Sequence, residues 1–220
     1  MDISRTTFSN RAEAGRFLAG YLSAYADLNP VAIGLPRGGV VIAAEIARVL
    51  KCDMDVLIAG KLRAPFNPEL AIGAITESGL VFLNSEVMGS IRVDDDYLEE
   101  EKRSRLKTIK QRLETYRRVK AKVSLYGRCV IIADDGIATG STMISALQAA
   151  KAEGAGRIVA AVPGGPQDTT EKLCRAAQDV EVVCPVMPAL FYAVSQLYTD
   201  FSQVEDEEVL EILKEFSGSE

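Results

Sequence analysis

Short apolar runs alternate with longer amphipathic segments along most of this chain. The apolar runs have the length of strands, whereas the longer segments carry apolar residues at helical spacing. Such alternation is typical of parallel strands joined by helical crossovers, so the pattern predicts an α/β fold with a parallel sheet. The predicted strands are 31–35, 54–59, 129–133, 157–162 and 180–184. The predicted helices around them are 9–27, 40–50, 141–153, 167–177 and 207–216.

The middle of the chain, at about 61–125, departs from this alternation and is interpreted as an insertion. A loop at 60–69 leads into a predicted hairpin with strands at 71–75 and 80–83. A long helix is predicted at 94–120, because acids crowd its first turns and bases its end, an order that suits the helix dipole. Its narrow apolar stripe fits either a helix lying across its own domain or a partner helix in a dimer. The stripe consists of Leu106, Ile109, Leu113 and Tyr116.

Composition narrows the class of protein. The chain has 220 residues, of which 48% are hydrophobic and 25% charged, which suits one globular domain, 1–220. Its formal net charge of -6 argues against a general binder of nucleic acid or of membrane surfaces, because such binders need a net basic face. The basic end of the long helix, with Arg117 and Arg118, is the only candidate patch for RNA.

Other absences bear on location and chemistry. No apolar run reaches the ~18 residues of a membrane span, and the N-terminus lacks the apolar stretch of a signal peptide, so we expect a cytoplasmic protein. Its four cysteines are expected to be reduced core thiols. The absence of histidine removes imidazole bases and histidine metal sites. Chemistry is left to carboxylates, lysine, arginine, tyrosine, cysteine and backbone amides, which is compatible with a carboxylate-bound or substrate-bound Mg²⁺.

The densest chemical signal lies at 130–142, where an apolar strand leads into two aspartates and then a loop of small residues that opens a helix. Free amides and the positive dipole end at such a helix start suit a phosphate monoester. Gly136 and Gly140 permit close backbone approach, and Asp134 and Asp135 are placed to accept hydrogen bonds from a ribose diol. No lysine follows Gly140, which argues against an ATP-type loop. A simple polar turn with a helix cap is the alternative, and it leaves the paired acids unexplained.

This segment resembles the motif with which type I phosphoribosyltransferases bind 5-phosphoribosyl 1-pyrophosphate (PRPP). The similarity extends to a less-characterised branch of that family and covers nearly the whole chain. It implies a Rossmann-like parallel sheet with an inserted hairpin and long helix, and a small hood at about 185–204. It also implies that Asp134 and Asp135 hold the ribose hydroxyls and a Mg²⁺. The implied ligands of the 5-phosphate are Gly136, Ile137, Ala138, Thr139, Gly140, Ser141 and Thr142.

A second loop, at 35–40, resembles the pyrophosphate loop of the same family. Arg37 offers a fork of donors, and Gly38 and Gly39 let backbone amides reach an anion. A simple strand-to-helix turn would account for the two glycines but not for the arginine. The resemblance also assigns Lys61 to the pyrophosphate, although Gly60 stands where many relatives have arginine. The implied catalytic residues are Arg37, Lys61, Asp134 and Asp135.

The resemblance implies a Mg²⁺-dependent enzyme of nucleotide salvage that transfers the phosphoribosyl group of PRPP to a nucleobase or related nitrogen acceptor and releases pyrophosphate. Phe191 and Tyr192 are the implied base-binding residues of the hood, with ordinary core packing as the alternative for each. Ala138 stands where relatives specific for 6-oxopurines have aspartate, which argues against hypoxanthine and guanine. A PRPP-binding regulatory protein without turnover is the alternative class of function. We expect a homodimer whose ligands are PRPP and a small-molecule acceptor.

Overall fold

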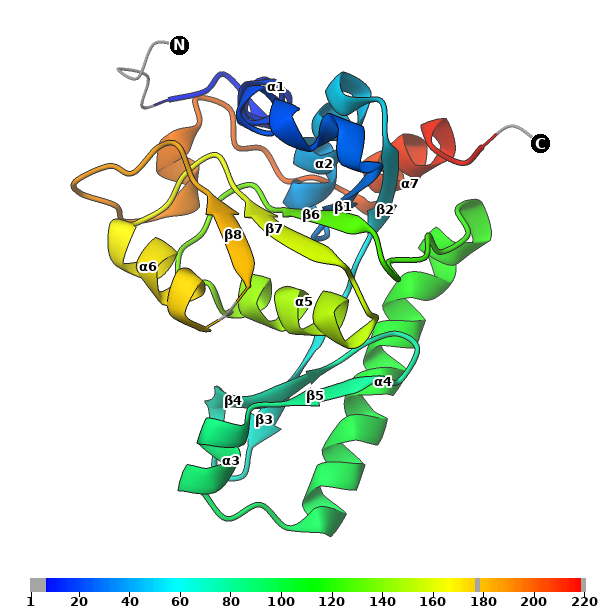
Figure 1. Ribbon diagram of the computed structural model, residues 1–220, viewed down its shortest axis with the longest axis vertical. Helices are drawn as coiled ribbons and strands as arrows, with labels where there is room; N and C mark the ends of the chain where they lie inside the picture. Colours follow the sequence, from blue (N-terminus) through cyan, green and yellow to red (C-terminus); the bar gives the residue numbers. More distant parts are fainter. Residues whose placement is uncertain (1–6, 177–178, 219–220) are drawn as a thin grey trace.

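The computed structural model describes residues 7–176 and 179–218. Its centre is a five-stranded parallel sheet in the order β2-β1-β6-β7-β8 (Figure 1). The predicted α/β fold with a parallel sheet is therefore confirmed. The strands are β1 (Pro30–Gly34), β2 (Asp53–Val56), β6 (Cys129–Ala133), β7 (Arg157–Ala161) and β8 (Val180–Val183).

Each face of this sheet has its own hydrophobic core. In β6, Ile131 and Ala133 pack on one face, whereas Val130 and Ile132 pack on the other. A strand that is covered on both faces reads as an unbroken apolar run, which is why β1 and β6 stand out in the sequence. The first face is covered by α1 (Arg11–Tyr21), η1 (Ser23–Leu28), α2 (Gly38–Leu50) and α7 (Asp206–Glu215), and the second by α5 (Ser141–Ala152) and α6 (Gln167–Ala176).

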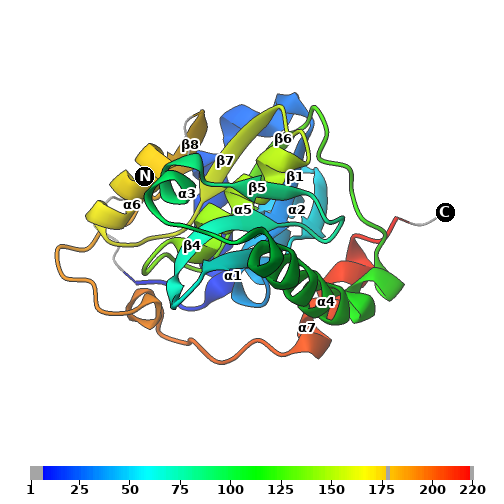
Figure 2. The same cartoon turned by 90° about the horizontal axis from the view of Figure 1, so that it is seen from below.

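Residues 60–119 form a projecting unit that extends away from the main sheet, below α5 in Figure 1. It holds a three-stranded antiparallel sheet, with the long α4 running along it (Figure 2). Helix α5 packs between this small sheet and the main one. The elements of the unit are β3 (Gly60–Ala64), β4 (Asn67–Ile75), β5 (Val81–Leu83), α3 (Ser85–Ser90) and α4 (Asp95–Val119).

Several predicted elements need correction. The loop expected at 60–69 is mostly strand, because residues 60–64 pair with β4 and alternate between buried and solvent-facing side chains. The strand expected at 54–59 ends at Val56, the last residue that pairs with β1. The helix expected at 9–27 ends at Tyr21 and continues as the separate 3-10 segment η1. Helix α3 was not expected.

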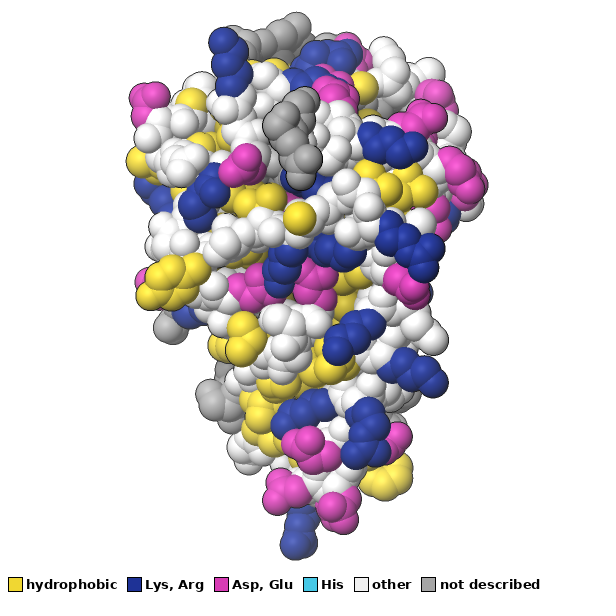
Figure 3. Space-filling model, turned by 90° about the vertical axis from the view of Figure 1, so that its right-hand side faces the viewer, with side chains coloured by type: hydrophobic (Ala, Val, Ile, Leu, Met, Phe, Trp, Pro, Cys, Tyr) yellow, Lys and Arg dark blue, Asp and Glu magenta, His cyan; other side chains and the backbone are white. Residues whose placement is uncertain are grey.

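The apolar stripe of α4 is used within the chain. Ile109, Leu113 and Tyr116 are buried, and the helix packs against β3 and α7. The first of the two interpretations, a helix lying across its own domain, is therefore confirmed. Figure 3 shows basic and acidic side chains interspersed over one face of the molecule rather than a single basic patch. Among the described helices, none combines the length and the apolar character that crossing a membrane requires.

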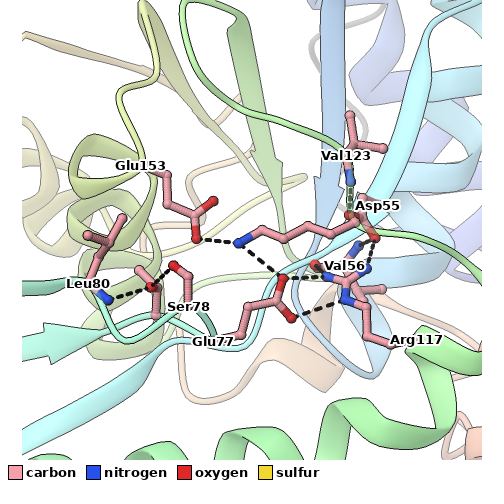
Figure 4. A network of polar contacts seen from close by, with 10 residues as sticks. Asp55, Val56, Glu77, Ser78, Leu80, Arg117, Val123 and Glu153 are labelled. Atoms are coloured by element: carbon pink, nitrogen blue, oxygen red, sulfur yellow. Dashed lines mark hydrogen bonds and ion pairs between the residues drawn. The ribbon is translucent and has the colours of Figure 1, made fainter.

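A polar network joins the projecting unit to the main sheet (Figure 4). The Arg117 guanidinium donates to Asp55 Oδ1 at 2.7 Å, to the Val56 carbonyl at 3.1 Å and to both carboxylate oxygens of Glu77 at 3.0 Å. Lys122 bridges Glu77, at 3.1 Å, to Glu153 on the segment after α5, at 2.6 Å. Arg117 therefore belongs to an internal ion-pair network and not to a basic face that is open to RNA.

Candidate active site

The segment that follows β6 forms a loop around a small hollow. The hollow has a volume of about 230 Å³ and is lined by residues 134–143 together with Val194. Gly140 caps α5 with a φ of 75°, a left-handed conformation that favours glycine. The first amides of α5 face no carbonyl of their own helix, so this loop offers hydrogen-bond donors and the positive end of a helix dipole to an anion. The Thr169 hydroxyl donates to the Ala138 carbonyl at 3.0 Å and so fixes the outer part of the loop.

Two carboxylates stand at the entrance to this loop. Asp134 Oδ1 accepts a hydrogen bond from the Asp135 amide at 2.9 Å. Burial and the neighbouring charge of Asp135 raise the pKa of Asp134 to about 8, although the Asp135 amide and Arg11 oppose this shift. An added cation would favour the ionised form of this carboxyl, because an opposite charge nearby stabilises a carboxylate.

The second glycine loop packs directly against the acidic pair. A Cβ at Gly38 would lie 2.0 Å from Asp135 Oδ2, and one at Gly39 would lie 2.5 Å from the Ala133 carbonyl oxygen. Both positions therefore require glycine for the loop to approach the end of β6. The preceding peptide bond, between Pro36 and Arg37, is cis.

A larger cavity of about 690 Å³ lies beside the two loops. Arg37 of the glycine loop lines it, and so does Thr142 at the start of α5. The projecting unit supplies three further cationic side chains, Lys61 and Arg63 from β3 and Arg112 from α4. The one carboxylate in the lining, Asp206, accepts a hydrogen bond from the Tyr116 hydroxyl at 2.5 Å. The cavity thus carries an excess of positive charge and suits a polyanion.

The comparisons with known proteins identify the family. A family model described as a phosphoribosyl transferase domain matches residues 9–182. The chain belongs to this family. A candidate phosphoribosyl transferase of Mycobacterium tuberculosis is 44% identical to it over 206 residues, which make up 94% of this chain and 46% of the mycobacterial protein. The chain therefore spans about half the length of the curated relatives it matches.

A solved structure agrees with this assignment at the level of the fold. The crystal structure of a Thermus thermophilus protein matches this chain with a TM-score of 0.88 and 41% sequence identity. The match covers 96% of this chain and 100% of the Thermus chain. The two proteins therefore share the whole architecture, projecting unit included.

The structure brings together most of the site residues that were predicted from the sequence. Arg37 and Lys61 line the larger cavity, and the acidic pair lines the phosphate-sized hollow with the loop after it. Of the two predicted base-binding residues, Phe191 packs against the main core and Tyr192 is 82% exposed. Neither residue lines the two cavities just described.

Sequence reasoning missed several residues of the site. Arg11 contacts Asp135, and the Tyr198 hydroxyl donates to the Asp135 carbonyl at 2.6 Å. Arg112 is one of many charged residues on α4 and carries no local signal. Arg11 is separated from Asp135 by 124 positions in the sequence, so only the folded chain reveals that contact.

The acidic pair is also a candidate metal site. Within 7–176 and 179–218, the structure shows no group of three or more histidine, cysteine, aspartate or glutamate side chains that could hold an ion. Two adjacent carboxylates fit Mg²⁺ nonetheless, because this ion is held by one or two carboxylates together with water and substrate phosphates. Asp134 and Asp135 are therefore the residues that would hold Mg²⁺ when a phosphorylated substrate supplies the remaining oxygens.

Proposed function

We propose that this protein transfers the 5-phosphoribosyl group of PRPP to a nitrogen atom of an acceptor and releases pyrophosphate. One observation carries the proposal: a phosphate-sized hollow that two carboxylates help to line adjoins a cavity lined by four cationic side chains, and Thr142 lines both. PRPP carries a phosphate at one end, a diphosphate at the other and a ribose diol between them. The two adjoining cavities and the acidic pair therefore offer candidate partners for each of these groups.

Each part of the substrate has candidate ligands. The 5-phosphate would accept hydrogen bonds from the amides and hydroxyls of residues 136–142. Asp134 and Asp135 would accept hydrogen bonds from the ribose hydroxyls. The diphosphate would lie in the cationic cavity, where Arg37 and Lys61 would bind its oxygens. The Gly38 amide would approach it from the adjoining loop, whereas the Gly39 amide donates to the Leu35 carbonyl at 3.1 Å. Arg63 and Arg112 line the same cavity, and Arg63 is a candidate to replace the arginine that many relatives have at the position of Gly60.

The reaction places modest demands on the protein. The bond between ribose C1 and the pyrophosphate oxygen breaks while the acceptor nitrogen forms a bond to C1, so negative charge grows on the leaving group and positive charge on the ring. Fixed cations on one side and carboxylates on the other would stabilise both charges. Mg²⁺, when bound, would supply further positive charge to the diphosphate. No side-chain nucleophile is needed, which suits a chain without histidine.

The acceptor is proposed to be a nucleobase or a related nitrogen compound. Ala138 offers no carboxylate to exchange a proton with a 6-oxopurine, which favours other acceptors. Phe191 and Tyr192 are the proposed base-binding residues, and Tyr192 is well exposed for such a contact. Activity in the whole protein would place the chain in nucleotide salvage.

The proposal is tested by mixing the protein with PRPP, Mg²⁺ and a pool of nucleobases, and by measuring pyrophosphate release and product mass. A new nucleotide mass supports catalysis and names the acceptor. Asp135→Asn should reduce turnover at least ~100-fold, the scale of removing a polar contact to a developing charge. Asp168→Asn, which alters an exposed carboxylate paired with Lys172, serves as the matched control and should leave turnover unchanged.

Three outcomes separate the functions. Near-normal turnover in Asp135→Asn would contradict the role given to that carboxylate. PRPP binding without turnover, measured by calorimetry, would favour a regulatory protein. A wild-type protein that neither binds nor consumes PRPP would overturn the proposed function.

A further inference from the structure

Arg11, on the first turn of α1, is clamped between the acidic pair and the C-terminal segment. Its Nε donates to Asp135 Oδ2 at 2.7 Å, and its Nη1 donates to the Ser202 carbonyl at 2.7 Å. The guanidinium carbon lies 3.9 Å from the centre of the Phe201 ring. Only 11% of the arginine side chain and 16% of the Asp135 side chain are exposed. This ion pair is therefore far better shielded from water than a surface pair.

The local sequence holds the start of α1 in place. Asn10 caps the helix by accepting from the Glu13 amide at 3.0 Å, and Glu13 accepts from the Ser9 amide at 2.6 Å. These two bonds cap the start of α1 and hold the backbone from which the Arg11 side chain projects. Phe8, three residues before Arg11, donates a backbone hydrogen bond to Leu197 and accepts one from Thr199, both at 2.7 Å.

The same C-terminal segment reaches the acidic pair a second time. The Tyr198 hydroxyl bonds to the backbone of Asp135, as described above, and its ring stacks on Phe201 at a centroid distance of 5.1 Å. The glycine loop closes the remaining side, because a Cβ at Gly38 would meet both Asp135 Oδ2 and Arg11 Nε. Asp135 is thus surrounded by three separate segments, and Arg11 supplies the positive charge among them.

We propose that Arg11 is a positioning residue that neutralises Asp135 and fixes its carboxylate for the ribose of PRPP. The inference rests on the proposed function of this site. Two adjacent carboxylates repel an incoming polyanion, and a cation held within hydrogen-bonding distance removes most of the repulsion from one of them. Because the guanidinium is already held by Ser202 and Phe201, no reorganisation is needed when the substrate arrives.

PRPP affinity, measured by calorimetry on the full chain, tests the proposal with two variants and a control. Arg11→Met should weaken PRPP binding about 10- to 100-fold, the range expected for losing a hydrogen bond to a charged group. Arg11→Lys keeps the charge but loses the fork of donors, so its affinity should fall between those of the wild type and Arg11→Met. Arg16→Met, on the same helix, removes a half-exposed arginine whose partner Glu45 keeps Arg48, and it should bind PRPP like the wild type.

A second measurement separates an electrostatic role from a merely structural one. Without Arg11 the acidic pair keeps more uncompensated negative charge, so Arg11→Met should bind Mn²⁺ alone more tightly, on the order of 10-fold, as followed by electron paramagnetic resonance. Opposite changes in the two affinities support the proposal. A variant that binds both PRPP and Mn²⁺ more weakly has lost structure, and that result would overturn the electrostatic role.

The remaining outcomes keep this inference distinct from the proposed function. Wild-type and Arg11→Met proteins that bind PRPP equally would overturn the role of Arg11 and leave the proposed function standing. A wild-type protein that does not bind PRPP would overturn both. Should circular dichroism show that Arg11→Met does not fold, Arg11→Lys decides: a loss of PRPP affinity of at least about 3-fold supports the proposal, and an unchanged affinity overturns it.

Discussion

The phosphate loop and the projecting unit both contribute to the site, but the chain builds them in different ways. The loop at 134–140 lies between one strand and the helix that follows it, so its groups are neighbours in the sequence. The projecting unit brings Lys61 and Arg63 from a strand and Arg112 from a distant helix. The groups of the first region are therefore contiguous in the sequence, whereas those of the second come together only when a whole subassembly docks.

The forces that hold the two regions also differ. Backbone hydrogen bonds tie the loop to neighbouring strand ends, from the Asp134 amide to the Ala161 carbonyl at 3.3 Å and from the Ile137 amide to the Gly164 carbonyl at 3.1 Å. The projecting unit is joined to the main sheet through apolar contacts and through the Arg117 network. Side-chain contacts, apolar and charged, therefore hold the cations of the projecting unit beside the main sheet.

Among single substitutions, the largest effect is expected when Arg117 is removed from this network. Arg117→Met should lower the free energy of unfolding by about 3 kcal/mol, because it leaves the buried carboxylate of Asp55 without its cation and Glu77 with Lys122 alone. Urea denaturation measures the change. Arg118→Met, one position along α4, removes only an exposed pair with Glu114 and should cost less than about 0.5 kcal/mol. Equal losses in the two variants would show that the network does not anchor the unit.

A smaller effect is expected in the loop itself. Gly140→Val forces a β-branched residue into a left-handed conformation, at a cost of about 2 kcal/mol, so PRPP affinity should fall about 30-fold. Gly127→Val is the matched control, because Gly127 also has a positive φ, of 69°, but has open space around it just before β6. Calorimetry with PRPP should show an unchanged affinity for the control. An unchanged affinity in Gly140→Val would mean that the phosphate binds elsewhere.

The difference between the regions also explains how much the sequence predicts. The parallel sheet, both glycine loops and the acidic pair follow from contiguous patterns, in which an apolar run leads directly into small or acidic residues. Strand β3 escaped prediction because it spans only five residues beside Pro65 and Pro68, and its pairing with β4 is a tertiary contact. Arg11 and Arg112 escaped because nothing near them in sequence marks a charged residue as part of a site rather than of a solvated helix face.

The smallest effect should come from Arg112, the exposed cation that α4 adds to the cavity. Among the described residues Arg112 makes no ion pair, and its side chain is solvent-exposed, so Arg112→Gln should raise the KM for PRPP about 5-fold, equivalent to about 1 kcal/mol, with little change in kcat. Arg118→Gln removes the same charge from the same helix outside the cavity and should leave the KM unchanged. The salt dependence of the KM adds a check, since screening by 0.5 M salt should shrink the difference between these two variants. If both variants raise the KM equally, α4 contributes only a general positive field. The contacts to the diphosphate would then come from Arg37, Lys61 and Arg63.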